Sequence, residues 1–235
     1  MKIFAKIRFY WGAFVISFIV AAIMIPLITI FPKYKGKIMH NLNRVILFFM
    51  NVKVKAYGQR DEKANMFIIN HQGIMDIIAL EAIEYTHFSW VAKKELFDTP
   101  WFGYLLKNGD MISVDRENKA GLIKLLKDVK ESVEVKNRAV AIFPEGTRSA
   151  TQELLPFKAG TKLVANKLNL RVQPIVITGS KYALNEHNKT AHSGTINVHY
   201  LEAFDIKDAP KDWYERVQER MKEKIEEEYE KGIER

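Results

Sequence analysis

The sequence predicts an α/β fold in which a mostly parallel sheet is covered by helices and preceded by a two-helix segment. Two observations lead to this prediction. After residue 57, short apolar runs of strand length alternate with longer amphipathic runs of helix length. Before it, an uncharged stretch at 11–31 is followed by an amphipathic stretch at 38–54. We therefore expect an N-terminal helical hairpin at 1–57 and an α/β domain at 58–235.

Charge is distributed unevenly along the chain of 235 residues. The net charge is +8, from 36 Lys and Arg against 28 Asp and Glu. Ten of the basic residues precede Asp61, the first acidic residue, which leaves 26 basic against 28 acidic residues in the remainder. A basic excess confined to an apolar N-terminus argues against a nucleic-acid binder and suits an anionic membrane surface. The absence of cysteine excludes disulfides, thiol nucleophiles and cysteine-based metal sites.

The N-terminal segment is expected to associate with a membrane. Pro26 should kink or end the first helix, which leaves about 15 uncharged residues before it, or about 22 Å. Lysines and arginines flank both ends of the stretch, so charge assigns no orientation across a bilayer. We favour a hairpin dipping into one leaflet, with 33–37 as its connector. A single transmembrane helix and a cleaved signal peptide are the alternatives.

Beyond residue 58, apolar runs rich in β-branched residues and bounded by polar ones predict strands. These strands are 66–70, 87–92, 111–114, 139–143, 172–178 and a more exposed 195–204. Longer runs with helical spacing predict helices at 74–85, 101–106, 120–133, 160–168 and 212–232. The last has an inner stripe of Trp213, Val217, Met221, Ile225 and Tyr229. Repeated strand–helix units predict parallel strands, whose carboxyl ends are where ligands bind in such sheets.

The stretch Asn70-His71-Gln72-Gly73-Ile74-Met75-Asp76 is the strongest candidate for a reactive site. On one regular helix, five steps would turn Asp76 about 140° away from His71. The two can meet if His71 lies in a strand-to-helix turn, which Gly73 permits, and Asp76 in the first helical turn. A carboxylate on one imidazole nitrogen fixes the tautomer and makes the other nitrogen a general base. The structural alternative is a histidine at a helix start and an aspartate near its positive end.

Three further stretches follow or begin strands. Ser113-Val114-Asp115-Arg116 and Phe143-Pro144-Glu145-Gly146-Thr147-Arg148-Ser149 follow strand ends, and a third strand carries Pro174. In a parallel sheet, the side chains of His71, Asp76, Arg116, Glu145 and Arg148 gather at one edge. Two arginines would suit a phosphate dianion, and Glu145 could accept a hydrogen bond from a substrate hydroxyl. The alternatives are a surface ion pair at 115–116, an i,i+3 pair at 145–148 and a simple turn at 144–146.

Together these stretches resemble the lysophosphatidic acid acyltransferases, within the wider glycerolipid acyltransferase family. Residues 70–76 match the family's His-x4-Asp motif, with Gly73 where serine is more usual. Residues 91–96 resemble the next family segment, and 112–116 and 143–149 match the second and third motifs. Pro174 fits the fourth motif weakly, because Arg171 replaces a second proline. The resemblance covers roughly residues 66 to 180.

The resemblance implies transfer of a fatty acyl group from acyl-CoA or acyl-carrier protein to the sn-2 hydroxyl of 1-acylglycerol 3-phosphate, which gives phosphatidic acid. It implies no metal and no cofactor besides the acyl thioester. His71 is then the general base and Asp76 orients it. The residues expected to bind substrate are Arg116, Glu145, Gly146, Arg148, Lys93 and Pro174. The implied surroundings are an anionic membrane on the cytoplasmic side, with acyl-carrier protein as a candidate partner and no nucleic acid.

Three alternatives to this function remain open. A metal-dependent hydrolase would use His71 and Asp76 as ligands, although the other histidines form no metal-binding spacing with them. A non-enzymatic binder of anionic lipids would depend on the basic N-terminus alone. An acyltransferase could also act on another glycerolipid acceptor, such as glycerol 3-phosphate or a lysophospholipid with a larger head group.

Overall fold

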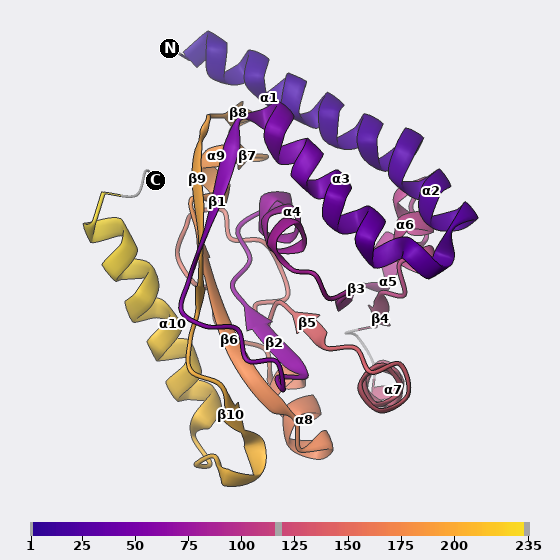
Figure 1. Ribbon diagram of the computed structural model, residues 1–235. Coiled ribbons are helices and arrows are strands. Elements are labelled where there is room, and N and C mark those ends of the chain that lie inside the picture. The colour runs from indigo at the N-terminus through magenta and orange to yellow at the C-terminus, as the bar shows by residue number, and fades with distance from the viewer. Residues whose placement is uncertain (1, 116–118, 233–235) are drawn as a thin grey trace.

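The computed structural model describes residues 2–115 and 119–232, and its centre is an eight-stranded sheet with helices on both faces (Figure 1). The strand order is β1-β9-β6-β2-β5-β3-β4, and β10 pairs with β6. β2 runs parallel to β5 and β6, β3 runs parallel to β4 and β5, and β1 runs parallel to β9. β6 pairs antiparallel with β9 and β10. The predicted mostly parallel α/β class is confirmed.

The strands of this sheet are short and mostly buried. They are β1 Val52–Tyr57, β2 Met66–Ile69, β3 Ser89–Lys93, β4 Ile112–Val114, β5 Val140–Ile142, β6 Arg171–Thr178, β9 Gly194–Tyr200 and β10 Phe204–Asp205. The expectation of a more exposed last strand was wrong, because β9 lies between β1 and β6 and most of its residues are buried. Its polar residue His199 contacts Glu228 of the C-terminal helix instead of water.

Ten α-helices are present in the described part of the chain. They are α1 Lys2–Phe18, α2 Ile25–Ile30, α3 Lys35–Met50, α4 Ile74–Ile83, α5 Lys94–Phe97, α6 Phe102–Asn108, α7 Lys119–Lys130, α8 Ala159–Leu168, α9 Ser180–Ala183 and α10 Trp213–Glu230. Two π-helical segments, η1 Ile19–Met24 and η3 Glu131–Val135, extend α1 and α7. Two 3₁₀ segments, η2 Pro32–Tyr34 and η4 Ile206–Asp208, lie between elements.

Strand β2 divides the hydrophobic core between the two faces of the sheet. Phe67 and Ile69 pack with residues of α1, α3 and α4, whereas Met66 and Ile68 pack with residues of α7, α8 and α10. All four side chains are fully buried. An uninterrupted apolar strand is typical of a parallel sheet that is covered on both faces, and here it places the residue after Ile69 at the edge of that sheet.

The N-terminal helix is longer than the sequence suggested. Pro26 does not end it: α1, η1 and α2 form one apolar helix over Lys2–Ile30, long enough by length and composition to cross a membrane. Pro26 lies in the first turn of α2, directly after the π-helical segment. In that segment the N–H of Ile25 bonds to the carbonyl of Val20, so the regular hydrogen-bond pattern is already altered where Pro26 lacks an N–H.

The first helix and α3 form an antiparallel pair above one face of the sheet (Figure 1). Arg8 Nη2 donates to the carbonyl of Met50 at 2.9 Å, and Trp11 Nε1 donates to that of Phe49 at 3.2 Å. Helix α3 ends at Met50, four residues before the predicted end, because Asn51 adopts a left-handed conformation. The next residues form β1, which joins the sheet although it lies within the segment 1–57.

A short hairpin between β6 and β9 was not predicted. Its strands are β7 Leu184–Asn185 and β8 Thr190–Ala191, and it packs against α1. Strands of two residues are too short to show a periodic pattern in the sequence. The hairpin matters because its first turn residues, Glu186 and His187, reach the cavity described below.

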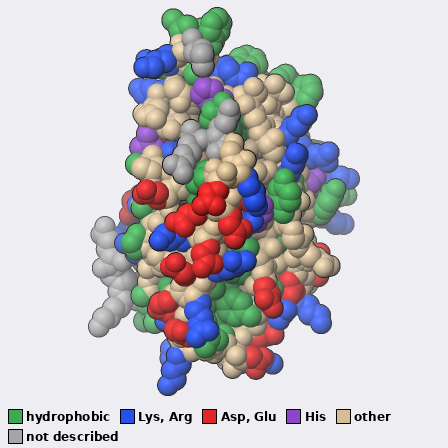
Figure 2. Space-filling model, turned by 90° about the vertical axis from the view of Figure 1, so that its left-hand side faces the viewer, with side chains coloured by type: hydrophobic (Ala, Val, Ile, Leu, Met, Phe, Trp, Pro, Cys, Tyr) green, Lys and Arg blue, Asp and Glu red, His purple; other side chains and the backbone are tan. Residues whose placement is uncertain are grey.

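Helix α10 covers the opposite face of the sheet from α3 and α4. Four residues of the predicted stripe, Trp213, Val217, Met221 and Ile225, are buried, and Tyr229 is partly buried. Figure 2 shows the side of the molecule on which α10 lies, where acidic and basic side chains are intermixed. This face therefore lacks the single-sign charge expected of a membrane-binding surface.

We predict that Met221→Ala lowers the free energy of unfolding by about 2–5 kcal/mol, because it leaves a cavity beneath α10. Met221 is fully buried in the core. Chemical denaturation of the protein in detergent measures the change. Lys222→Ala, on the exposed side of the same helix, should change the free energy by less than about 0.5 kcal/mol. Equal effects of the two substitutions would contradict this packing.

Candidate active site

The turn between β2 and α4 is organised by one carboxylate oxygen. Asp76 Oδ2 accepts hydrogen bonds from the backbone N–H of Gln72 at 2.6 Å and of Gly73 at 2.9 Å. The same oxygen lies 2.9 Å from Nδ1 of His71. Asp76 is fully buried in the first turn of α4, where the helix dipole also favours a negative charge. The expected meeting of His71 and Asp76 is therefore present, with the histidine in the turn.

The histidine ring is held on its other sides by β5 and its following loop. It stacks on Phe143, with ring centroids 3.8 Å apart and planes 13° from parallel. Its backbone N–H donates to Oε1 of Glu145 at 2.6 Å, and its carbonyl accepts from the N–H of Ser149 at 3.0 Å. These contacts fix both the backbone and the ring of His71, which leaves Nε2 as the nitrogen that can face a substrate.

Glu145 is buried and both its carboxylate oxygens are engaged by backbone. Oε2 accepts from the N–H of Leu155 at 2.8 Å, in addition to the bond that Oε1 receives from His71. Burial raises the pKa of Glu145 to about 7, and the two backbone N–H groups oppose that shift. In this structure Glu145 thus contacts the turn that carries His71, and its expected contact with a substrate hydroxyl stays a prediction.

Gly146 and Arg148 follow in the same loop. The N–H of Gly146 donates to the carbonyl of Phe143 at 3.1 Å and closes a tight turn, in which Gly146 has φ +73°. The turn directs Arg148 to the rim of the cavity, where its side chain is 42% exposed. There its Nη1 lies 3.1 Å from Oε1 of Glu186, on the β7–β8 hairpin.

A buried lysine lies behind the Asp76 turn. Lys181 Nζ donates to the carbonyl of Gln72 at 3.2 Å and to that of Ser149, and lies 3.3 Å from Nδ1 of His187. Burial lowers the pKa of Lys181, and the carboxylates of Glu186 and Asp76 oppose that shift. Oδ1 of Asp76 is buried without a hydrogen-bond partner among the described residues, so Lys181 supplies positive charge close to a carboxylate that needs it.

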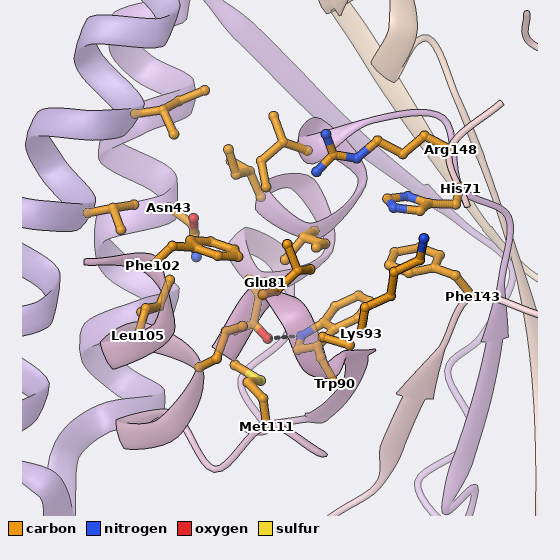
Figure 3. A pocket seen from close by; sticks show the side chains of 18 of the residues that line it. Asn43, His71, Glu81, Trp90, Lys93, Phe102, Leu105, Met111, Phe143 and Arg148 are labelled. Carbon is orange, nitrogen blue, oxygen red and sulfur yellow. Dashed lines mark hydrogen bonds between the residues drawn. The ribbon is translucent and has the colours of Figure 1, made fainter. Parts of the chain in front are cut away.

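A cavity of about 850 Å³ extends from His71 toward the N-terminal helices (Figure 3). One end holds His71, Phe143, Lys93 and Arg148, whose side chains lie close together in the view. The rest of the lining is mainly apolar and includes Ile16, Val20, Met24, Met39, Ile77, Ile78, Phe102, Leu105 and Leu106. The volume lies in the range of small-molecule binding sites.

Polar side chains also line the cavity beside the apolar ones, among them Asn43 and Glu81. Glu81 is 2% exposed and accepts a hydrogen bond from Nε1 of Trp90 at 2.6 Å, drawn as the dashed line in Figure 3. Burial raises the pKa of Glu81 to about 7, against the opposing effect of that bond. Trp90 stacks in turn on Phe143, with ring centroids 5.3 Å apart, and Phe143 stacks on His71. Glu81 is therefore connected to the His71 ring through two aromatic side chains.

The structure brings most of the predicted site residues to one edge of the sheet. His71, Asp76, Glu145, Gly146 and Arg148 adjoin one another, and Lys93 lines the same cavity. Pro174 lies elsewhere, buried inside the sheet in register with Ile68 of β2, and is not among the residues that line the cavity. Arg116 lies outside the described residues, although it follows β4, which runs parallel to β3.

Sequence reasoning missed Lys181, Glu186 and the polar residues that flank His71. Asn70 exchanges two hydrogen bonds with the backbone of Ile177 on β6, at 2.8 and 2.7 Å. Gln72 contacts Tyr229 of α10 and Ser180. Asn70 and Gln72 belong to the motif at 70–76 and are polar residues beside a buried strand, which was a usable signal. Lys181 and Glu186 follow no motif, and only the fold brings them to the site.

The described residues contain no group of three or more His, Asp or Glu side chains that could hold a metal ion. The fold and the site thus define an α/β protein with an aspartate-oriented histidine, of the kind that acts as a general base, at the rim of an apolar cavity.

Comparison with known proteins agrees with this class. The model of the Acyltransferase family matches residues 51–178. A 1-acyl-sn-glycerol-3-phosphate acyltransferase from Helicobacter pylori is 38% identical over 179 residues, which cover 76% of this chain and 75% of that protein. One from Cocos nucifera is 30% identical and covers 72% of this chain, but the match spans 55% of its own length.

The fold is also found in a solved structure. The crystal structure of the 1-acyl-sn-glycerophosphate acyltransferase PlsC from Thermotoga maritima covers 97% of this chain and 98% of its own, with a TM-score of 0.79 and 21% identity. That likeness concerns the fold. The family match and the Helicobacter relative together show that this chain belongs to the Acyltransferase family.

We predict that Glu81→Gln stabilises the protein in a pH-dependent manner. The pKa of Glu81 rises from 4.5 to about 7 on folding, so the protein loses stability as the pH rises from the first value through the second. The variant stays neutral and keeps an acceptor for Trp90. Chemical unfolding should give nearly equal stabilities near pH 4 and a variant more stable by about 3 kcal/mol at pH 8. A difference in unfolding free energy between the two proteins that stays constant from pH 4 to pH 8 would contradict the raised pKa of Glu81.

Proposed function

We propose that this protein is a 1-acylglycerol-3-phosphate acyltransferase, which moves a fatty acyl group from acyl-CoA or acyl-carrier protein to the sn-2 hydroxyl and forms phosphatidic acid. The observation that supports this most is the His71–Asp76 pair, with a 2.9 Å contact, at the rim of a large apolar cavity. The names of the relatives from Helicobacter pylori and Cocos nucifera support the same acceptor.

In the proposed reaction His71 acts as the general base. Asp76 holds the proton on Nδ1, so Nε2 takes the proton of the sn-2 hydroxyl as its oxygen attacks the thioester carbonyl. The resulting tetrahedral intermediate then expels the thiolate, which receives the proton back from the imidazolium. Glu145 positions the backbone of His71 through the 2.6 Å bond. The reaction uses no cofactor besides the acyl thioester and no covalent enzyme intermediate.

The acceptor's phosphate binds, in this proposal, at the polar end of the cavity. Arg148 and Lys93 contribute charged side chains there. The turn at Gly146 places its backbone in the wall of the cavity. A guanidinium offers two parallel N–H groups to a phosphate. Arg116 is proposed to join them from the end of β4, by analogy with the family motif, and Pro174 to support the sheet beneath the site. The apolar end, lined by α1, η1, α3 and α6, accommodates acyl chains.

The N-terminal segment, residues 1–57, is proposed to anchor the enzyme on the cytoplasmic side of an anionic membrane as a monotopic hairpin. Large apolar side chains are exposed along it, among them Phe4, Trp11, Phe14, Phe18 and Phe48. The pair with α3 supports a hairpin, because a helix crossing the bilayer would carry the hydrogen-bonded α3 and the adjoining sheet with it into the lipid. A membrane-seated cavity would let lipid substrates enter without passing through water.

We predict that His71→Ala lowers kcat for acyl transfer at least several hundredfold, since a positioned base contributes about 10²–10⁴. The assay uses purified protein, labelled acyl-CoA or acyl-carrier protein, and a panel of 1-acylglycerol 3-phosphate, glycerol 3-phosphate and lysophosphatidylcholine. His192→Ala, a histidine that stacks on Tyr182 and does not line the cavity, is the matched control. Retention of activity by His71→Ala, or transfer to none of these acceptors by the wild-type protein, would refute the proposal.

Arg148→Ala should act mainly on acceptor binding. We predict a KM for 1-acylglycerol 3-phosphate raised about tenfold or more, with a smaller change in kcat, because a hydrogen bond to a charged group contributes about 1.5–3 kcal/mol. Arg148→Lys keeps the positive charge but loses the planar guanidinium. Its KM should therefore lie between those of the wild-type protein and Arg148→Ala. Initial rates against the mole fraction of acceptor in mixed micelles measure both constants. An unchanged KM would remove Arg148 from the phosphate site.

A further inference from the structure

Glu186 connects the two parts of the site that the proposed function assigns to catalysis and to phosphate binding. Its Oε1 lies 3.1 Å from Nη1 of Arg148 and 3.3 Å from the backbone N of Ile74, the first residue of α4. The side chains of Arg148 and Glu186 are 42% and 25% exposed, so water can reach the ion pair. A soluble group of the right charge could therefore replace either partner.

The position of Glu186 compensates for Gly73 at the start of α4. Gly73 is the N-cap residue of that helix and has no side chain to accept a hydrogen bond from the first helical N–H groups. A Cβ atom built at Gly73 would lie 3.5 Å from Oε2 of Glu186. Glu186 thus lies in front of the helix start, and its carboxylate accepts a hydrogen bond from the N–H of Ile74, the first N–H of the helix.

The charge of Glu186 has a second consequence at the rim of the cavity. Glu186, Arg148 and His71 all line that rim. A phosphate that takes the Nη1 donor of Arg148 displaces the carboxylate from it. Both the acceptor and the product of the proposed reaction carry such a phosphate. A resident counterion therefore weakens the binding of substrate and product by the same factor. Such a uniform change in binding alters KM without accelerating the chemical step.

We propose that Glu186 is a displaceable counterion of Arg148, which sets how tightly the site holds a phosphate-bearing lipid and speeds the release of the product. The proposal rests on the proposed function for its kinetic part. Its binding part requires only that Arg148 receives a phosphate. By returning to Arg148, the carboxylate prevents the product's phosphate from remaining bound after the acyl group has been transferred.

Glu186→Gln tests this proposal, because the amide retains an acceptor for Ile74 and loses the charge. We expect KM for 1-acylglycerol 3-phosphate and the inhibition constant of phosphatidic acid to fall together, about three- to tenfold, with kcat changing less. For monoacylglycerol, which has no phosphate, KM should be the same in variant and wild type. A KM that stays constant or rises, or one that falls equally for monoacylglycerol, would overturn the proposal.

A second variant excludes a purely structural effect on α4. Gly73→Ser combined with Glu186→Ala supplies a new N-cap while removing the carboxylate, and the 3.5 Å clearance admits the added atoms. It should reproduce the kinetic change of Glu186→Gln. Glu219→Gln, an exposed carboxylate on α10 outside the cavity lining, is the control for loss of one charge and should change neither constant.

A direct binding measurement distinguishes the counterion role of Glu186 from the proposed acyltransferase function. Calorimetric titration with glycerol 3-phosphate should give a Kd about three- to tenfold lower for Glu186→Gln than for the wild-type protein. Tighter binding in a protein that transfers no acyl group would refute the proposed function and leave the counterion role intact. Equal or weaker binding by the variant would refute the counterion role even if acyl transfer is found.

Discussion

One buried oxygen atom, Oδ2 of Asp76, holds the site together. It receives the N–H groups of Gln72 and Gly73 and lies 2.9 Å from His71 Nδ1, so the turn's shape and the histidine's orientation have one cause. A carboxylate this deeply buried needs such donors, because a buried charge without partners is costly. The helix dipole of α4 and the nearby ammonium of Lys181 add to that compensation. The same contacts that shape the turn therefore also support the chemical role proposed for Asp76.

The parallel sheet explains why distant segments complete this turn. β2 and β5 are neighbours and run in the same direction, so the loop after β5 meets the turn after β2. Glu145 connects the two directly by accepting the N–H of His71, and Phe143 supports the ring. The N-terminal helices close the cavity on one side, and α1 also supports the hairpin that carries Glu186. The proposed membrane anchor thus forms part of the cavity wall.

The sequence predicted best what depends on contiguous residues. The strand, the turn, the helix and the His71–Asp76 contact all follow from seven residues with clear apolar runs on either side. The two backbone N–H groups that Glu145 accepts could not be predicted, because they come from segments that are separate in the sequence. Pro26 was expected to kink or end the first helix. The helix continues past it, and the sequence does not show the π-helical segment that precedes it. Lys181 and Glu186 become neighbours of the site only through the order of strands, and Arg116 lies outside the described residues.

The most direct test of the central interaction is the tautomer of His71, measured by NMR of protein labelled with ¹⁵N at histidine. If Asp76 accepts from Nδ1, the neutral imidazole should carry its proton on Nδ1, with a strongly hydrogen-bonded N–H signal that disappears in Asp76→Ala. The site would then have Nε2 ready to receive a proton. A neutral His71 protonated on Nε2, or a spectrum unchanged by removal of Asp76, would contradict the account.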